Sequence, residues 1–168
     1  MSKNTRYITH AALIAATYIA LTYLQNFLVP NSASFAIQFR VSEALCVLAL
    51  FTPAAIPGLT IGCLLFNLSF AGALPLDFLV GSLATFLAVG GMYLMRHICI
   101  KGYPLPAMLL PAITNAALVG WELAFYIGGG FWINALYVAI GEAAVLLILG
   151  TALFYTMKAR RLDALLFG

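Results

Sequence analysis

Long apolar segments, almost free of charge, determine what this chain of 168 residues can fold into. A helix needs about 20 predominantly apolar residues to cross the hydrocarbon core of a bilayer. Four segments meet that requirement, namely residues 7–28, 77–97, 105–127 and 131–158. Because lipid offers the backbone no hydrogen bonds, apolar segments of this length cross a membrane as helices. The sequence therefore predicts an all-α integral membrane protein.

The composition excludes the other common classes of protein. Hydrophobic residues make up 64% of the chain, charged residues only 8%, and the mean hydropathy is +1.06. A soluble domain has about 25% charged residues, so this chain has too few polar side chains to cover a globule in water. The net charge of +3 comes from only eight basic and five acidic residues, which leaves no basic stripe for nucleic acid. Three cysteines without a Cys-x-x-Cys pair predict neither a disulfide framework nor a metal site.

The segment 41–70 is too long for one span and too short for two full ones. Its middle holds Pro53 and Pro57, and each proline removes a backbone donor and disfavours helix at the preceding residue. Short spans are tolerated where neighbouring helices bury the irregular backbone. We therefore predict short helices at 41–52 and 55–70, joined by a Pro-rich hairpin. The whole chain is then a single membrane domain, residues 1–168, built as a six-transmembrane-helix bundle.

The basic residues predict the orientation of these helices. With six spans both termini lie on one side, and of the basic residues only Arg40 falls on the other. The first side holds Lys3, Arg6, Arg96, Lys101, Lys158, Arg160 and Arg161. Because cytoplasmic loops carry an excess of Lys and Arg, we expect a multi-pass protein of the cell membrane with both termini cytoplasmic. A five-helix alternative, with 41–70 as one span, splits the basic residues six against two.

Polar residues inside the predicted spans are the candidates for a substrate-binding site. An ionised side chain at the centre of a bilayer costs about 2.5–3.5 kcal/mol on insertion scales, so it needs a cavity or a partner. We assign to the site one basic, four acidic and three amide residues, which are Arg40, Glu43, Asp77, Glu122, Glu142, Asn67, Asn115 and Asn134. This charge balance favours a cationic or hydrogen-donating ligand over an anionic one.

Structural roles are the alternative for these polar residues. Arg40 and Glu43 are three residues apart and could pair with each other. Asp77 could cap the helix that it opens. Glu142, near the middle of the last span, could pair with Asn115.

Aromatic residues crowd the same end of the bundle. We include Trp121 and Tyr137 in the predicted site because an aromatic ring can stack on a flat ligand. An interfacial belt of aromatic residues is the alternative. Glu122, next to Trp121, could likewise reach water at the end of its helix instead of binding a ligand.

Small residues recur at four-residue spacing on the first helix, at Ala11 and Ala15 and at Ala12 and Ala16. This spacing lets two helix backbones approach closely. The alanines could pack inside the bundle or form a docking face for another membrane subunit.

The known catalytic and nucleotide-binding motifs are missing from the sequence. It contains no phosphate-binding loop of the Gly-x-x-x-x-Gly-Lys-Ser/Thr type, no His-Glu-x-x-His motif and no Gly-x-Ser-x-Gly motif. We therefore expect neither an ATPase nor another enzyme, and no metal site.

The sequence resembles the QueT family over nearly its whole length. The blocks that carry the resemblance are 38–45 (QFRVSEAL), 51–59 (FTPAAIPGL), 61–63 (IGC), 76–77 (LD), 81–85 (GSLAT), Asn115, 121–122 (WE) and 131–142 (FWINALYVAIGE). The stretch from Arg40 to Gly62 is the most specific of them.

This resemblance implies a substrate-binding (S) component of a group II energy-coupling factor (ECF) transporter, with a six-helix fold and an external pocket. It implies uptake of a queuosine precursor, a 7-deazaguanine base in its aminomethyl form or queuine. The implied partners are a transmembrane coupling subunit and two ABC ATPases, which use ATP, so no cofactor is expected in this chain. In S components an Ala-x-x-x-Ala pattern on the first helix contacts the coupling subunit, and Ala11, Ala12, Ala15 and Ala16 match it.

The predicted acids suit a base of this kind. A guanine-like edge presents a ring N–H and an exocyclic amine side by side, and one carboxylate can accept both. An aminomethyl cation would require a second carboxylate. Two alternatives stay open: an S component for another small vitamin, and a self-sufficient secondary transporter that couples to protons through Glu122 or Glu142.

Overall fold

The computed structural model describes residues 2–29 and 40–167, with only the backbone at 163–165. Within these ranges the fold is helical, apart from an isolated bridge between Ile100 and Tyr103. The elements in chain order are α1 (Lys3–Leu28), η1 (Val41–Leu50), α2 (Ala55–Ser69), α3 (Asp77–Leu94), α4 (Leu105–Tyr126), α5 (Phe131–Val145), η2 (Leu146–Gly150), α6 (Thr151–Ala159) and α7 (Leu162–Phe167). The all-α prediction is confirmed for the described residues.

Four of these helices are long and apolar enough to cross a bilayer. They are α1, α3, α4 and the continuous helix Phe131–Ala159, which comprises α5, η2 and α6. The shorter apolar helices η1 and α2 occupy most of the segments 41–52 and 55–70. The structure thus agrees with a multi-pass membrane protein, while the crossing of the bilayer by η1 and α2 stays a prediction.

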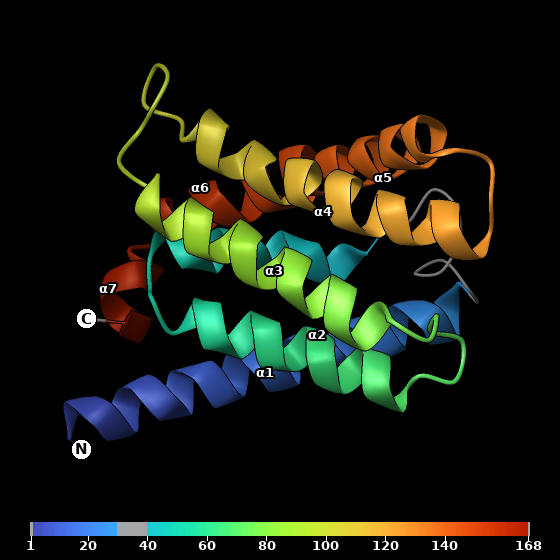
Figure 1. Ribbon diagram of the computed structural model, residues 1–168. Coiled ribbons are helices and arrows are strands. Elements are labelled where there is room, and N and C mark those ends of the chain that lie inside the picture. The colour runs from blue at the N-terminus through green and yellow to red at the C-terminus, as the bar shows by residue number, and fades with distance from the viewer. Residues whose placement is uncertain (1, 30–39, 168) are drawn as a thin grey trace.

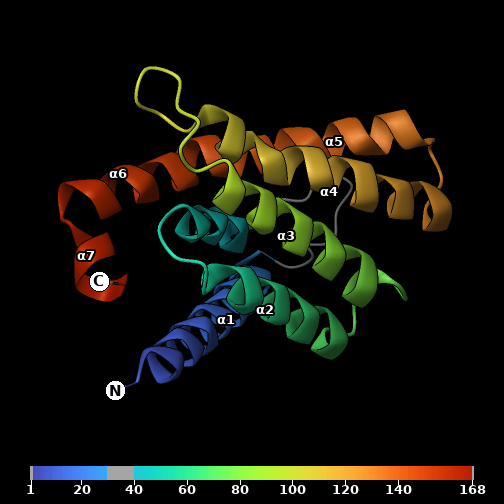
Figure 2. The same ribbon diagram turned by 60° about the vertical axis from the view of Figure 1, so that its left-hand side comes forward.

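The short helix η1 occupies the middle of the bundle. Helices α1 to α5 follow one another around it, each packed on the next along the chain (Figures 1 and 2). The ten residues of η1 form a 3-10 helix, although 3-10 runs longer than three or four residues are uncommon. Most of its side chains are buried, among them Cys46 and Val47. Neighbouring helices therefore shield its irregular backbone from lipid.

The last long helix changes its winding where it meets η1. Residues Leu146–Gly150 form a π turn within it. A Cβ added to Gly150 would lie 3.1 Å from a methyl carbon of Val47 in η1 and 3.1 Å from Met108 in α4. The absence of a side chain at Gly150 therefore lets this helix approach both neighbours.

Helices α1 and α2 pack closely through two glycines. A Cβ at Gly58 would lie 2.8 Å from the carbonyl oxygen of Ala11, and one at Gly62 would lie 3.0 Å from the Cβ of Tyr18 and 3.1 Å from the carbonyl oxygen of Ala15. Ala15 is buried in this contact, so one pair of the small residues on α1 serves packing inside the bundle.

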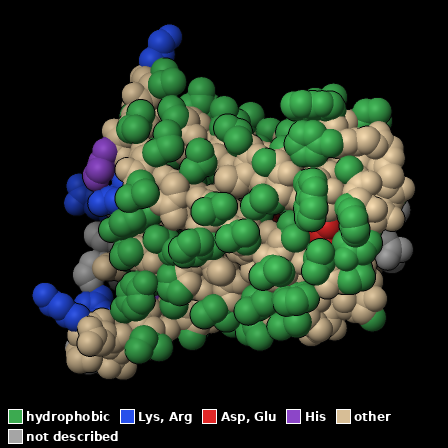
Figure 3. Space-filling model, in the orientation of Figure 1, with side chains coloured by type: hydrophobic (Ala, Val, Ile, Leu, Met, Phe, Trp, Pro, Cys, Tyr) green, Lys and Arg blue, Asp and Glu red, His purple; other side chains and the backbone are tan. Residues whose placement is uncertain are grey.

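The two ends of the bundle differ in charge. The start of α1, the loop 95–104 and α7 lie at one end, at the left of Figure 1, and the connections 70–76 and 127–130 lie at the other. Lys and Arg side chains gather at the first end in Figure 3, whereas an acidic side chain shows between apolar ones in the opposite half. This arrangement is the one that the predicted orientation requires.

Replacing Gly62 by leucine should destabilise the fold, because the added side chain cannot fit between α1 and α2. Overpacking of this kind costs about 1–3 kcal/mol. We expect a lower midpoint of thermal unfolding in detergent. Gly90→Leu is the matched control, because a Cβ at Gly90 meets nothing within 4 Å. Equal midpoints for the two variants would contradict the close α1–α2 contact.

Candidate ligand-binding site

The eight polar residues predicted for the site are all buried. None of them is more than 6% exposed, and Glu122 is completely inaccessible. Glu122 therefore does not reach water at the end of its helix. They come from five elements: the start of η1, the end of α2, the start of α3, the middle and last turns of α4, and the first and last turns of α5.

Seven of these residues form one group, which we call the Arg40 cluster. Its members are Arg40, Glu43, Asn67, Asp77, Asn115, Glu122 and Glu142. Arg40 lies within electrostatic reach of Glu43 and Asp77, and its charge also acts on Glu122 and Glu142. Four carboxyl groups thus lie within electrostatic reach of one guanidinium. With all five groups ionised, the cluster carries a formal charge of −3.

Glu43 is held by hydrogen bonds from two sides. The hydroxyl of Tyr18 donates to its Oε1 at 2.6 Å, and the thiol of Cys46 donates to its Oε2 at 3.2 Å. One turn further along α1, Thr22 donates to the hydroxyl of Ser42 at 2.8 Å. These bonds fix the start of η1 against α1, so Glu43 has a structural role whatever else it binds.

Asp77 and Asn67 together shape the connection into α3. The backbone N–H of Leu74 donates to the Asp77 carboxylate at 2.8 Å, and the Asn67 amide donates to the Asp77 carbonyl oxygen at 2.9 Å. Leu76, not Asp77, is the N-cap residue of α3. The Asp77 side chain therefore closes the turn before the helix instead of capping it.

Several buried acceptors in this region have no hydrogen-bond partner among the described residues. They are both carboxylate oxygens of Glu122, Oε2 of Glu142, and the side-chain oxygens of Asn67 and Asn26. The other oxygen of Glu142 accepts from the Asn115 amide at 3.0 Å, as the structural alternative for this pair expected. Glu122 lies beside Asp77, another acid, which cannot satisfy it when both are ionised.

An unpaired buried polar group costs about 1–3 kcal/mol, and more when it is charged. Native proteins keep few such groups, and each calls for an explanation. All the unpaired atoms here are acceptors, so a ligand that satisfies them must bring donors. The geometry suits a molecule with several N–H groups or a cationic amine. Within the described part of the chain, no three acidic, His or Cys side chains come together as a metal site.

The family of the chain follows from a comparison with known proteins. The model of the family described as QueT transporter matches residues 8–159. The chain belongs to this family. The family predicted from the sequence is thereby confirmed, and a transporter family argues against an enzyme.

A curated QueT relative adds a more detailed but shorter match. It is the queuosine precursor transporter QueT of Lactococcus lactis subsp. cremoris (strain MG1363), 40% identical over 95 residues. The match covers 54% of this chain and 53% of the relative, so the chain spans about half the length of that relative. No solved structure matches the chain.

Three predicted site residues of this QueT family member lie outside the Arg40 cluster. The Asn134 amide donates to the carbonyl oxygens of Gly128 at 2.7 Å and Gly130 at 3.0 Å, and so ties down the glycine turn before α5. Trp121 is 50% exposed and stacks on Phe125, with ring centroids 6.0 Å apart. Tyr137 is also exposed. The two rings lie on the outside of the bundle, as an aromatic belt would.

A polar stripe on α1 was not predicted from the sequence. Tyr18, Thr22 and Asn26 are spaced by four residues, lie on one face of the helix and are all buried. Their spacing in an otherwise apolar span was the available signal. Helix α1 therefore contributes polar side chains to the region of the site, in addition to packing against α2.

A buried carboxylate without a hydrogen-bond partner should lower the stability of the folded protein, and the Glu122→Met variant tests this for Glu122. Removing such a charge in favour of an apolar side chain of similar size is often neutral or stabilising, by up to about 1–4 kcal/mol. We expect Glu122→Met to raise the midpoint of thermal unfolding of the ligand-free protein in detergent.

Glu43→Met is the matched control for this test. Its carboxylate accepts two hydrogen bonds, so this substitution should lower the same midpoint. If Glu122→Met destabilises the protein as much as Glu43→Met does, Glu122 has a partner within the chain and its burial needs no ligand.

Proposed function

We propose that this QueT family member is the substrate-binding component of an ECF-type transporter and captures a queuosine precursor, a 7-deazaguanine base. The observation that carries the proposal is the set of buried acceptors without partners in and beside the Arg40 cluster. The name of the Lactococcus relative supports the substrate class. Binding without chemistry is the proposed role of this chain.

The acceptors fit the hydrogen-bonding groups of such a base. Both oxygens of Glu122 lack hydrogen-bond partners, so this carboxylate could accept the ring N–H and the exocyclic amine of a guanine-like edge at once. The free oxygen of Glu142 offers a second anionic acceptor for an aminomethyl cation. A base without these donors would leave the buried acids unpaired, which is how such a site discriminates.

The proposed orientation places the Arg40 cluster toward the outside. In this arrangement residues 1–168 form one membrane domain with six spans, in which η1 and α2 are short spans joined by the Pro-rich hairpin. Both termini are cytoplasmic, because the end that holds them carries the basic side chains (Figure 3). The base would enter beneath the connection 29–40, of which residues 30–39 lie outside the described part of the chain.

The proposed partners are a transmembrane coupling subunit and two ABC ATPases, and ATP is used by the ATPases. This chain would then need no cofactor of its own. On α1, Ala11 and Ala15 face α2, whereas Ala12 and Ala16 are exposed. Of the small residues proposed to contact the coupling subunit, Ala12 and Ala16 are therefore the pair in position to do so.

Neutralising either open acid should weaken ligand binding. We expect Glu122→Gln and Glu142→Gln each to reduce the affinity for an aminomethyl 7-deazaguanine by more than about tenfold, because a charge-assisted hydrogen bond is worth about 1.5–3 kcal/mol. Isothermal titration calorimetry on the purified protein measures this. Asp163→Asn is the matched control, since Asp163 lies in α7, at the basic end of the bundle.

Two results would count against this proposal. Normal binding by both glutamine variants would mean that the acids are structural. If deazaguanines fail to bind while another small vitamin does, the class of substrate is wrong.

The exposed alanines make a separate prediction about transport. Ala16→Leu should leave ligand binding intact and reduce uptake by vesicles that contain the coupling subunit and both ATPases, because leucine separates the two helix surfaces. Ala117→Leu, at an exposed position of α4, is the control. Uptake by this chain alone, driven by a proton gradient, would instead identify a secondary transporter.

A further inference from the structure

A pocket whose described lining is opposite in charge to the Arg40 cluster lies at the end of the bundle that holds both termini. It has a volume of about 320 Å³ and is lined by Lys3, Arg6, Tyr7, His10, Thr52, Pro53 and Phe167. Three of these described lining residues are basic, two carry hydroxyl groups, and none is acidic. The four residues from α1 recur at three- and four-residue spacing, so they share one side of the helix.

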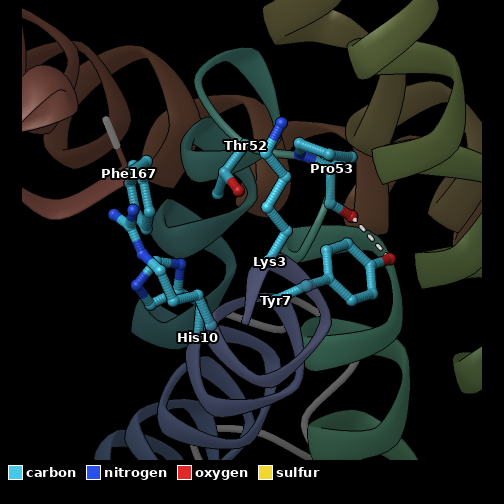
Figure 4. Close-up of a pocket in the computed structure, with 7 residues that line it drawn as sticks. Lys3, Tyr7, His10, Thr52, Pro53 and Phe167 are labelled. Atoms are coloured by element: carbon cyan, nitrogen blue, oxygen red, sulfur yellow. Dashed lines mark hydrogen bonds between the residues drawn. The ribbon is translucent and has the colours of Figure 1, made fainter. Parts of the chain in front are cut away.

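Three separate elements frame this basic pocket. Lys3 and Tyr7 extend from α1 toward the turn at Thr52 and Pro53, and His10 lies beside Phe167 of α7 (Figure 4). The Tyr7 hydroxyl donates to the carbonyl oxygen of Pro53 at 3.5 Å. The rings of His10 and Phe167 meet edge to face, with centroids 5.3 Å apart. The pocket is therefore a feature of the tertiary fold and not of one helix.

An apolar groove continues from the basic pocket along α1. Its volume is about 310 Å³, and it is lined by His10, Leu13, Ile14, Thr17, Leu48, Leu166 and Phe167. His10 and Phe167 line both spaces, so the two are contiguous. From His10 to Thr17 the helix rises by roughly 10 Å, away from the basic end.

We propose that the basic pocket and the apolar groove together bind one anionic phospholipid. The phosphate would lie between Lys3 and His10, and an acyl chain would follow the groove between Leu13 and Leu48. An ammonium or guanidinium group forms its strongest hydrogen bonds with phosphate oxygens, and the adjoining groove offers hydrocarbon contacts that a soluble anion cannot use. Basic residues at a membrane surface also attract anionic lipids in general, but only a built pocket selects one molecule.

The position of this lipid site separates it from the other functions proposed for the chain. It lies at the end opposite the Arg40 cluster. It also faces away from Ala12 and Ala16, which are two and six residues after His10 and so point to the far side of α1. A bound lipid would instead brace the start of α1 against the Thr52–Pro53 turn and α7.

Native mass spectrometry of the purified protein in detergent tests the proposal by titration with phosphatidylglycerol. We expect one lipid to bind, and Lys3→Gln to weaken its binding about fivefold, the effect of one basic residue at an anionic surface. Lys101→Gln is the control, because Lys101 is basic, exposed and at the same end but does not line the pocket. Thr17→Phe, which fills the groove without changing the charge, should also weaken binding.

Four outcomes would overturn the proposal. Phosphatidylcholine could bind as tightly as phosphatidylglycerol, or Lys101→Gln could weaken binding as much as Lys3→Gln. Either result would mean that lipid binds to this surface in general and not to the pocket. Inorganic phosphate or glycerol 3-phosphate could bind as tightly as the lipid, which would make the pocket a site for soluble anions. Release of the lipid on assembly with the coupling subunit would assign the groove to that protein.

Discussion

The need to neutralise charge inside an apolar bundle governs the half of this protein that holds the Arg40 cluster. Arg40 is buried among four carboxyl groups that come from η1, α3, α4 and α5. In a low dielectric a lone guanidinium would be prohibitively costly, so Arg40 depends on neighbouring carboxylates. The helices that carry them must therefore assemble around one point. Four acids and one base do not balance, however, and the remaining negative charge is what a ligand with N–H donors or an amine would offset.

The rest of the bundle depends on close helix packing instead of charge. Gly58 and Gly62 bring α2 onto α1, and Gly150 brings the last long helix onto η1. The buried core on this side is apolar, with Tyr18 at its border. Tyr18 packs against Gly62 and donates its hydroxyl to Glu43, so the same side chain links the packed core to the charged cluster. A substitution that moves α1 would therefore also disturb the Arg40 cluster.

The positions of the helices could be predicted from the sequence because length and apolarity alone determine them in a bilayer. The segments 77–97 and 105–127 contain the helices Asp77–Leu94 and Leu105–Tyr126. The buried polar residues could be predicted too, since an ionisable side chain in an apolar span rarely faces lipid. Trp121 and Glu122 are adjacent in the sequence, yet one is half exposed and the other inaccessible, because successive residues of a helix point about 100° apart.

The hydrogen bonds between distant segments could not be predicted from the sequence. The bond from Tyr18 to Glu43 joins residues 25 positions apart, and that from Asn115 to Glu142 joins residues 27 apart. Neither follows from spacing on one helix. The 3-10 winding of η1 could not be predicted either, because its ten residues are typical of a short apolar helix, whether α or 3-10.

Charged side chains are distributed unevenly along the bundle. Four of the five acids gather around the Arg40 cluster, where acceptors lack hydrogen-bond partners, and most bases gather at the other end, where a phosphate could bind. A cationic or donor-rich ligand would therefore be stabilised only near the Arg40 cluster and would meet like charge at the basic end. Such a gradient favours capture over spontaneous passage through the bundle. Under the proposed function, release at the basic end would require a rearrangement of the Arg40 cluster itself, and such a rearrangement would need partners that supply the energy.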